Sequence, residues 1–435
     1  MLVVAKFGGS SVANFTQFEK VKNIVLSKEN RRVVIVSALG KKEKEDSKIT
    51  DLLYLLHAHL KYSVPYDNIF NMIVSRFKDI KEKLNLNIDL DSEFAALKKE
   101  LNKELPEDYL VSRGEYITAK MMAEYLGYKF VDSKDLIFFD YSGVVNTEKT
   151  NEAINKAYQE NNRLVIPGFY GAYPNGVIKT FSRGGSDITG AIVSKALEAT
   201  IYENWTDVSG ILMADPKIIP NPKRINQITY NELRELSYMG ANVLHEDTVF
   251  PVQEGNIPIN ILNTNDPSNL GTIITENCDD ISQIITGISG KKHFTSFTIT
   301  KTHSANKTDV IRNTLNIFNK YKVAIEHIPS SIDSFSVVVY NKDVEKCIYD
   351  LVSELQNNND IKNVTVDNNI ALVAVVGRNM VTKPGTSGKV FGILGNAKIN
   401  IKMIAQGAQE LTIIVGVANE DFEKTINEIY YNLVK

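Results

Sequence analysis

The sequence has few of the residues that build covalent or metal frameworks. It contains only two cysteines in 435 residues, Cys278 and Cys347, and this number excludes a disulfide framework or a thiolate zinc site. Its six histidines have no nucleophile or metal-ligand partner at a useful spacing. We therefore expect no metal site built by the protein, and a reducing, cytoplasmic environment.

Long apolar runs and an excess of one charge are missing as well. No apolar run approaches the roughly 20 residues that span a bilayer, and residues 1–7 do not form a signal peptide, because Lys6 interrupts them. Lys and Arg number 49 against 52 Asp and Glu, so there is no basic surplus for a phosphate backbone. We expect neither a membrane nor a nucleic acid as a partner.

Short β-branched runs alternate with helical patterns over the first two-thirds of the chain. The runs are apolar on both faces, which is typical of parallel strands covered by helices on both sides. The pattern predicts an α/β fold, a three-layer αβα sandwich with a mostly parallel sheet. The predicted strands are 2–7, 32–39, 163–171, 200–205, 257–263 and 271–276, and the predicted helices include 15–26, 188–197 and 230–239. The charged stretch 41–48 is interpreted as a solvated loop.

An internal repeat occupies the last third, where residues 293–340 align with 369–416 without a gap. Each copy predicts a strand, a helix and two strands, a unit that leaves one apolar sheet face open. Two copies are therefore expected to pack against each other or against a partner chain. The predicted domains are 1–280, with a helical excursion at about 50–105, then 290–365, and 366–435 with a C-terminal helix.

Two glycine-containing turns each join a predicted strand to a helix. The first contains Lys6, Gly8 and Gly9, and the second contains Gly184 and Gly185. Glycines let backbone N–H groups approach an anion, and a helix N-terminus adds partial positive charge. A tight turn alone also explains each segment. Ligands of open α/β sheets bind at the carboxyl ends of the strands, where both turns are expected to point.

Charged side chains accompany these turns. Arg183 offers a planar fork for a carboxylate, and Glu115 stands at a predicted helix start. Close together, the two would bind the carboxylate and the ammonium of a zwitterion. Glu115 and Asp187 are also explained as acids that favour a helix N-terminus.

Taken in order, six motifs resemble the aspartate kinases of the amino acid kinase family. They are KFGGSS at 6–11, VSAL at 36–39, SRGE at 112–115, FSRGGSD at 181–187, TDVSGILMADP at 206–216 and MGANVLHEDTVFP at 239–251. The repeat resembles a pair of ferredoxin-like ACT regulatory domains, and 384–404 is the more typical copy. The resemblance covers essentially the whole chain.

The resemblance implies transfer of a phosphoryl group from MgATP to the β-carboxylate of L-aspartate, the first step of lysine, threonine and methionine biosynthesis. It implies catalytic roles for Lys6, Gly8, Gly9 and Asp187, and substrate contacts for Ser37, Thr50, Glu115, Arg183 and Ser186. The nucleotide site would comprise Lys6, Thr206, Asp207, Leu212, Asp215, Lys217, Asn242 and Val243.

Three positions depart from the family pattern. The loop before Thr50 is long and charged, Leu212 stands where some relatives have tyrosine, and Asn242 replaces a frequent lysine. Either Lys6, Lys217 and magnesium then neutralise the phosphates, or the activity is modest.

The ACT resemblance implies feedback inhibition by an amino acid and assembly into a homodimer or a dimer of dimers. The effector residues would be Glu326, Ser330 and Ser331, and their acidic surroundings favour lysine, with threonine as the alternative. Two other functions stay open. One is phosphorylation of another carboxylate, as by glutamate 5-kinase, and the other is amino acid sensing without catalysis.

Overall fold

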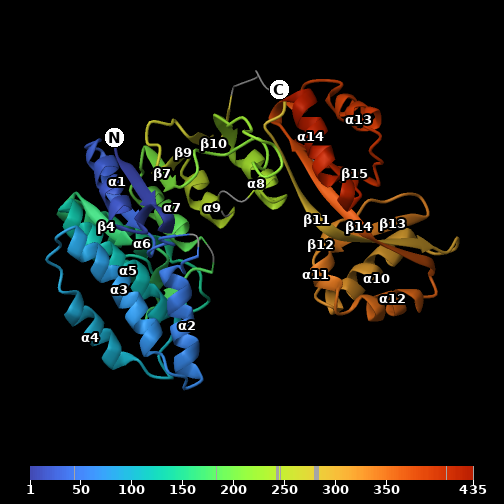
Figure 1. Cartoon of the computed structure of the whole chain (residues 1–435). Helices are drawn as coiled ribbons and strands as arrows, with labels where there is room; N and C mark the ends of the chain where they lie inside the picture. The colour runs from blue at the N-terminus through green and yellow to red at the C-terminus, as the bar shows by residue number, and fades with distance from the viewer. Residues whose placement is uncertain are drawn as a thin grey trace. The chain divides into compact units, whose positions relative to one another are not determined.

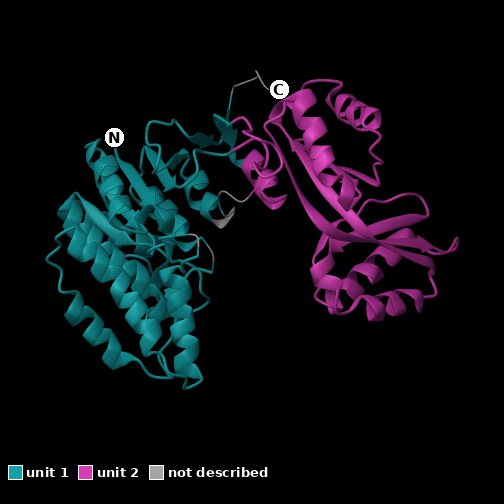
Figure 2. Cartoon of the chain, viewed as in Figure 1, with its two compact units in different colours: residues 1–211, 224–230, 243–278 teal, residues 212–223, 231–242, 279–435 magenta. Residues whose placement is uncertain are grey.

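The structure is a computed structural model that describes residues 1–43, 45–182, 184–241, 244, 246–278, 284–407 and 409–434. The chain forms two compact units, shown in Figure 2. Unit 1 comprises Met1–Ile211, Arg224–Tyr230 and Val243–Cys278, and unit 2 comprises Leu212–Lys223, Asn231–Asn242 and Asp279–Lys435. None of the helices described is long and apolar enough to cross a membrane.

Unit 1 is built on an eight-stranded sheet with the order β3-β4-β2-β1-β7-β9-β10-β8. Its strands run parallel except that β10 is antiparallel to β9 and parallel to β8. The strands are β1 Val3–Phe7, β2 Arg31–Val36, β3 Lys129–Phe130, β4 Leu164–Pro167, β7 Ile201–Thr206, β8 Gln227–Thr229, β9 Ile259–Asn263 and β10 Thr272–Thr275. A separate hairpin pairs β5 (Tyr170–Ala172) with β6 (Ile178–Thr180).

Helices cover both faces of this sheet (Figure 1). Along β1, Ala5 and Phe7 join a core with α1, α2, α3 and α5, whereas α7 packs over β1, β2 and β7 beside α6 and α9. The predicted three-layer αβα sandwich is therefore confirmed. The helices are α1 Phe15–Leu26, α2 Ile49–Lys61, α3 Asp67–Lys83, α4 Leu90–Glu100, α5 Glu107–Leu126, α6 Thr147–Asn161, α7 Gly185–Ala196 and α9 Glu246–Glu254, with short 3-10 turns at Gly9–Val12 and Ser133–Asp135.

Helix α1 shows how the local sequence fixes an element. The side chain of Asn14 accepts a hydrogen bond from the Gln17 N–H at 3.0 Å and caps the first turn. Phe18, Val21 and Val25 then fall on one buried face at helical spacing. The predicted bounds 15–26 agree with the structure.

Unit 2 is built on one six-stranded antiparallel sheet with the order β12-β13-β11-β14-β16-β15. The strands are β11 Gly287–Lys301, β12 Ile325–His327, β13 Ser334–Tyr340, β14 Ile361–Val376, β15 Met403–Gln406 and β16 Thr412–Val417. Its helices are α8 Tyr230–Tyr238, which starts on the last residue of a unit 1 segment, α10 Lys307–Lys320, α11 Asn341–Val344, α12 Ile348–Gln356, α13 Thr386–Asn396 and α14 Phe422–Leu433, with 3-10 turns at Arg378–Met380 and Asn419–Asp421.

The two repeat copies share this sheet. Each runs as strand, helix, strand, strand, as predicted, with β11-α10-β12-β13 matching β14-α13-β15-β16. The long strands β11 and β14 pair along their whole length, so that residues 287–291 of β11 lie beside 372–376 of β14. Residues 287–291 therefore belong to the sheet of the second ACT-like half, although they precede the first half in the chain. The boundaries predicted for the two ACT-like domains remain a proposal.

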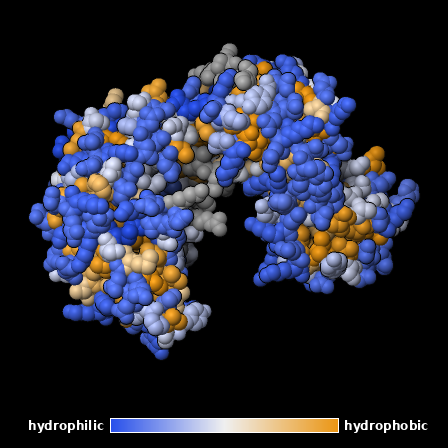
Figure 3. Space-filling view, in the orientation of Figure 1, coloured by the Kyte–Doolittle hydropathy of each residue, from blue (hydrophilic) through white to orange (hydrophobic). Residues whose placement is uncertain are grey.

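Most of the surface seen in Figure 3 is hydrophilic, with apolar groups scattered over both units. The exposed large apolar residues include Ile328 (40% exposed), Ile332 (83%) and Ile404 (52%). Two of them lie at the edges of the unit 2 sheet, because Ile328 follows β12 and Ile404 belongs to β15.

Candidate active site

A cavity of about 930 Å³ opens at the carboxyl ends of the unit 1 strands, where ligands of parallel sheets bind. It is lined by the turn after β1, the loop after β2, the first turns of α2 and α7, a residue of α5 and the end of β7. Ten predicted residues line it: Lys6, Gly8, Gly9, Ser37, Thr50, Glu115, Ser186, Asp187, Thr206 and Asp207.

A buried ion pair lies at the base of this cavity. Lys6 is only 7% exposed, and its Nζ lies 2.5 Å from Oδ1 of Asp187. Asn204, the neighbour of Lys6 across β1 and β7, completes the group, because its Nδ2 donates to Asp187 Oδ1 at 2.9 Å. Its Oδ1 also lies 3.5 Å from Lys6 Nζ. The ammonium therefore has a fixed position with donors left for an anion.

Two loops meet backbone to backbone beside this pair. The N–H of Gly40 donates to the carbonyl of Gly9 at 2.8 Å. A Cβ at Gly40 would lie 2.5 Å from the Gly9 carbonyl, and a Cβ at Gly9 would lie 3.0 Å from the Ala38 carbonyl. Position 40 therefore requires glycine, position 9 leaves little room for a side chain, and the contact places the turn after β1 against the loop after β2.

Glu115 is a carboxylate buried without an ion-pair partner among the described residues. It is 4% exposed, and its Oε2 makes no hydrogen bond with the described part of the chain. Burial raises the pKa of Glu115 to about 8, although the Ala38 backbone and the charge of Arg113 act in the opposite direction. A cation in the cavity would restore the ionised form, which makes Glu115 suited to an ammonium group.

The charged loop 41–48 does more than the predicted solvated loop, because Lys41, Lys42 and Lys48 line the cavity. Arg76 of α3 fixes this loop through Asp46 at 2.5 Å and the Gly40 carbonyl at 2.7 Å. Residues 41–43, 45 and 48 are exposed, in agreement with the predicted solvated loop, and its three lysines add positive charge near the two glycine turns, where an anion would bind.

Three of the predicted nucleotide residues are not among the described residues that line this cavity. Leu212, Asp215 and Lys217 belong to unit 2, where Asp215 Oδ1 accepts a hydrogen bond from the Lys217 N–H at 2.8 Å in a turn. The predictions for Arg183, Asn242 and Val243 lie outside the described residues.

Sequence reasoning missed Asn204, Gly40 and the lysines of the loop. Asn204 had a signal, since it is a polar residue inside the buried run 201–206. Gly40 had no such signal, because the need for glycine at this position arises from a contact between two loops that are distant in the sequence.

Comparison with known proteins places this geometry in a family. A model of the amino acid kinase family matches residues 1–263, more than half of the chain. The chain belongs to this family. An ACT domain model matches residues 373–433 as well.

The relatives narrow the assignment within the family. Aspartokinase 3 of Bacillus subtilis is 33% identical over 444 residues, covering 98% of this chain and 97% of its own. The chain therefore belongs with the aspartokinases of the amino acid kinase family, and the resemblance of the six motifs is confirmed.

Solved structures agree in fold. The Clostridium acetobutylicum aspartate kinase has a TM-score of 0.95 and 45% identity, covering 99% of this chain and 100% of that one. Escherichia coli aspartokinase III, which covers 100% of both chains, has been solved with aspartate and ADP (TM-score 0.79, 26% identity) and with lysine and aspartate (TM-score 0.78, 25% identity).

Proposed function

We propose that the protein transfers the γ-phosphoryl group of MgATP to the β-carboxylate of L-aspartate, giving 4-phospho-L-aspartate for the synthesis of lysine, threonine and methionine. The observation that carries this proposal is the Lys6–Asp187 pair beside the buried Glu115 in one cavity. The aspartate and ADP held by the Escherichia coli relative support the same substrates.

The chemistry needs no general base, because the attacking carboxylate is already ionised at pH 7. Catalysis then rests on positioning and on neutralising charge at the phosphoryl group. Lys6 has three N–H donors, so it can keep Asp187 and also bind the transferring phosphate, beside the backbone N–H groups of Gly8 and Gly9.

Substrate binding follows from the charges that line the cavity. Glu115 and Asp187 would hold the ammonium of aspartate, and Arg183 its α-carboxylate, with Ser37, Thr50 and Ser186 beside them. The nucleotide contacts would come from Thr206 and Asp207 in unit 1, from the unit 2 residues Leu212, Asp215 and Lys217, and from Asn242 and Val243. Magnesium would arrive with ATP, and its charge would offset that of the phosphates.

An ADP-release assay with aspartate or glutamate, combined with trapping of the acyl phosphate as a hydroxamate, tests the proposal. We expect turnover with aspartate and little with glutamate. Preference for glutamate would assign the chain to another carboxylate kinase. Binding of amino acids without ADP release would make it a sensor.

The affinity for aspartate is expected to depend on the ionisation of Glu115. Its pKa of about 8 lies above the ordinary value of 4.5, so the ammonium binds a site that must first lose a proton. The KM for aspartate should fall as the pH rises towards 8 and then level off. Glu115→Gln should raise this KM and remove that part of the pH profile, while the KM for ATP changes little. An unchanged profile in the variant would contradict the role of Glu115.

We further propose that an amino acid effector, lysine or alternatively threonine, binds the first ACT-like half at Glu326, Ser330 and Ser331. Glu326 already accepts a hydrogen bond from the Tyr238 hydroxyl at 2.5 Å, and Lys307 Nζ donates to the Ser331 carbonyl at 2.5 Å. An ammonium from the effector would compete with Tyr238 of α8 for the Glu326 carboxylate. The lysine in one structure of the Escherichia coli enzyme supports this effector.

Glu326→Ala is expected to relieve inhibition by lysine without lowering the uninhibited kcat. Inhibition requires the effector to bind one arrangement better than another, and a coupling of about 1–3 kcal/mol is typical. Titration of lysine against activity in both proteins measures this effect. Threonine, titrated in parallel, decides between the two effectors, and unchanged lysine inhibition in the variant would remove Glu326 from the site.

The sheet of unit 2 supports assembly into a homodimer or a dimer of dimers. Ile328 and Ile404 expose apolar surface at the two edges of the unit 2 sheet, and edge strands with free backbone groups pair readily with a second chain. Sedimentation of the purified protein measures the assembly.

A further inference from the structure

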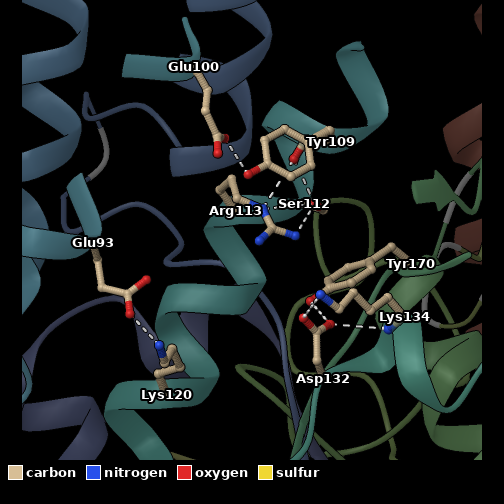
Figure 4. Close-up of polar contacts among 9 residues, drawn as sticks. All are labelled: Glu93, Glu100, Tyr109, Ser112, Arg113, Lys120, Asp132, Lys134 and Tyr170. Atoms are coloured by element: carbon tan, nitrogen blue, oxygen red, sulfur yellow. Dashed lines mark hydrogen bonds and ion pairs between the residues drawn. The ribbon is translucent and has the colours of Figure 1, made fainter. Parts of the chain in front are cut away.

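Unit 1 contains a second cavity, of about 670 Å³, on another side of α5 from the candidate active site. Tyr109, Arg113 and Tyr116 of α5 line it, and none of them lines the cavity that contains Glu115. The remaining wall comes from residues 100–106, the 3-10 turn after β3 and the β5–β6 hairpin: Glu100, Asn102, Leu105, Pro106, Asp132, Lys134, Gly176, Val177 and Ile178. Figure 4 shows several of these side chains.

Arg113 is a half-buried cation that makes no ion pair with any described residue. Its Nη2 donates to Ser112 Oγ at 2.9 Å, and its Nε lies 3.3 Å from the Tyr109 carbonyl, which leaves further N–H groups for another acceptor. Arg31 and Arg378, by comparison, each pair with a buried carboxylate.

Aromatic rings surround this guanidinium. Its Cζ lies 4.6 Å from the ring centre of Tyr109 and 4.4 Å from that of Tyr116, with Tyr170 at 5.8 Å. The rings hold the cation in place through cation–π contacts and give the cavity flat apolar surfaces. A guanidinium fixed in this way presents its N–H edge at little entropic cost.

The acidic groups of the cavity already have partners. Glu100 accepts a hydrogen bond from the Tyr109 hydroxyl at 2.5 Å, and Asp132 accepts one from the Tyr170 hydroxyl at 2.7 Å (Figure 4). Asp132 also accepts the Lys134 N–H at 3.1 Å. The Lys134 ammonium also lies 3.9 Å from Asp132. The cavity therefore contains carboxylates that already have partners and one guanidinium, that of Arg113, without a carboxylate partner among the described residues. The negative charges of Glu100 and Asp132 nevertheless disfavour a ligand that carries more than one negative charge.

We propose that this cavity binds a small monocarboxylic acid with an apolar body. The carboxylate pairs with the free N–H edge of Arg113, for which the planar fork is suited. The body packs on the rings of Tyr109 and Tyr116 and on apolar residues such as Leu105 and Ile178. The volume lies in the range of small-molecule sites. The proposal does not depend on the reaction assigned to the other cavity.

Calorimetry on the full chain with three probes tests the charge requirement. The probes are 3-phenylpropanoate, phenethylamine, which replaces the carboxylate by an ammonium, and inorganic phosphate. Each titration contains saturating aspartate, so that binding at an aspartate site is suppressed. We expect 3-phenylpropanoate to bind and the other two to bind at least about tenfold more weakly. Equal binding of phenethylamine or phosphate, or no binding of 3-phenylpropanoate, would overturn the proposal.

Substitutions then locate the binding. Arg113→Gln should weaken 3-phenylpropanoate binding at least about tenfold, and Tyr116→Leu should weaken it less, because the charge remains. Arg163→Gln is the matched control, since its guanidinium also lies over a tyrosine ring, 5.6 Å from Tyr128, but outside the cavity. Thermal midpoints of the variants detect unfolding, and Tyr116→Leu provides a second test if Arg113→Gln unfolds. Binding unchanged in Arg113→Gln, or lost equally in Arg163→Gln, would place the probe elsewhere.

Discussion

Lys6→Ala is expected to lower kcat by about 10²-fold or more. The Lys6 ammonium lies at the base of the cavity, 2.5 Å from Asp187, where it can meet the charge that develops on the transferring phosphoryl group. Removing one such contact costs roughly 3 kcal/mol of transition-state stabilisation. Steady-state rates of ADP release at saturating MgATP and aspartate measure the effect.

Lys179→Ala is a matched control for this measurement. Lys179 also pairs with an aspartate of unit 1, with its Nζ 3.3 Å from Asp108, but it does not line the cavity. Its kcat should stay near that of the parent protein. A Lys6→Ala protein that turns over at the parental rate would show that the phosphate is neutralised by other groups, such as the lysines of the loop 41–48.

Glu232→Ala is expected to destabilise unit 2 by about 3–5 kcal/mol, because it leaves a buried cation without its partner. The Glu232 side chain of α8 is completely buried and receives hydrogen bonds from the Arg378 guanidinium at 3.0 Å, the Arg378 N–H at 2.9 Å and the Thr286 hydroxyl at 2.5 Å. Chemical unfolding followed by circular dichroism measures the change.

Glu354→Gln serves as the control for Glu232→Ala. Glu354 accepts hydrogen bonds from Lys320 and Tyr321 of the same unit, but its charge lies at the surface and is screened by water. The unfolding midpoint of this variant should remain close to that of the parent. A similar loss of stability in both variants would mean that the buried pair contributes no more than a surface pair.

The sequence specified the parts of the fold that depend on local pattern. Helix α1 was placed at its observed bounds because one capping asparagine and one apolar face define it. The predicted strand 163–171 comprises two separate strands in the structure. The chain leaves the large sheet after Pro167, and the hairpin strand β5 begins at Tyr170. Apolar residues continue through the break, so periodicity alone does not reveal it.

The parts of the fold that depend on contacts between distant residues could not be predicted from local sequence patterns. The pairing of β11 with β14 distributes one ACT-like half over two stretches of chain, and no local pattern records which strands pair. Likewise, the motifs located Lys6 and Asp187, but the bridge between them through Asn204 depends on the register of β1 with β7.

Part of the stretch matched by the amino acid kinase model belongs to unit 2. The family model spans 1–263, yet the stretch 212–223 packs within unit 2. The N–H of Lys223 donates to the Tyr430 hydroxyl, and the N–H of Ile288 donates to the Met213 carbonyl, both at 2.7 Å. The segment that contains the proposed nucleotide residues Asp215 and Lys217 is therefore held to the ACT-like sheet and helix α14 by hydrogen bonds within unit 2.

Phe294 pairs with Ile370 across β11 and β14, so the first ACT-like half begins and ends at neighbouring positions of the sheet. The chain between these residues has its own apolar core, which includes Phe297, Phe318 and Leu351. An inserted segment of this kind can be exchanged between relatives without a change in the strand order of the remaining sheet. Responsiveness to one amino acid or another could then diverge by replacement of a single block, while the machinery for phosphoryl transfer is inherited unchanged.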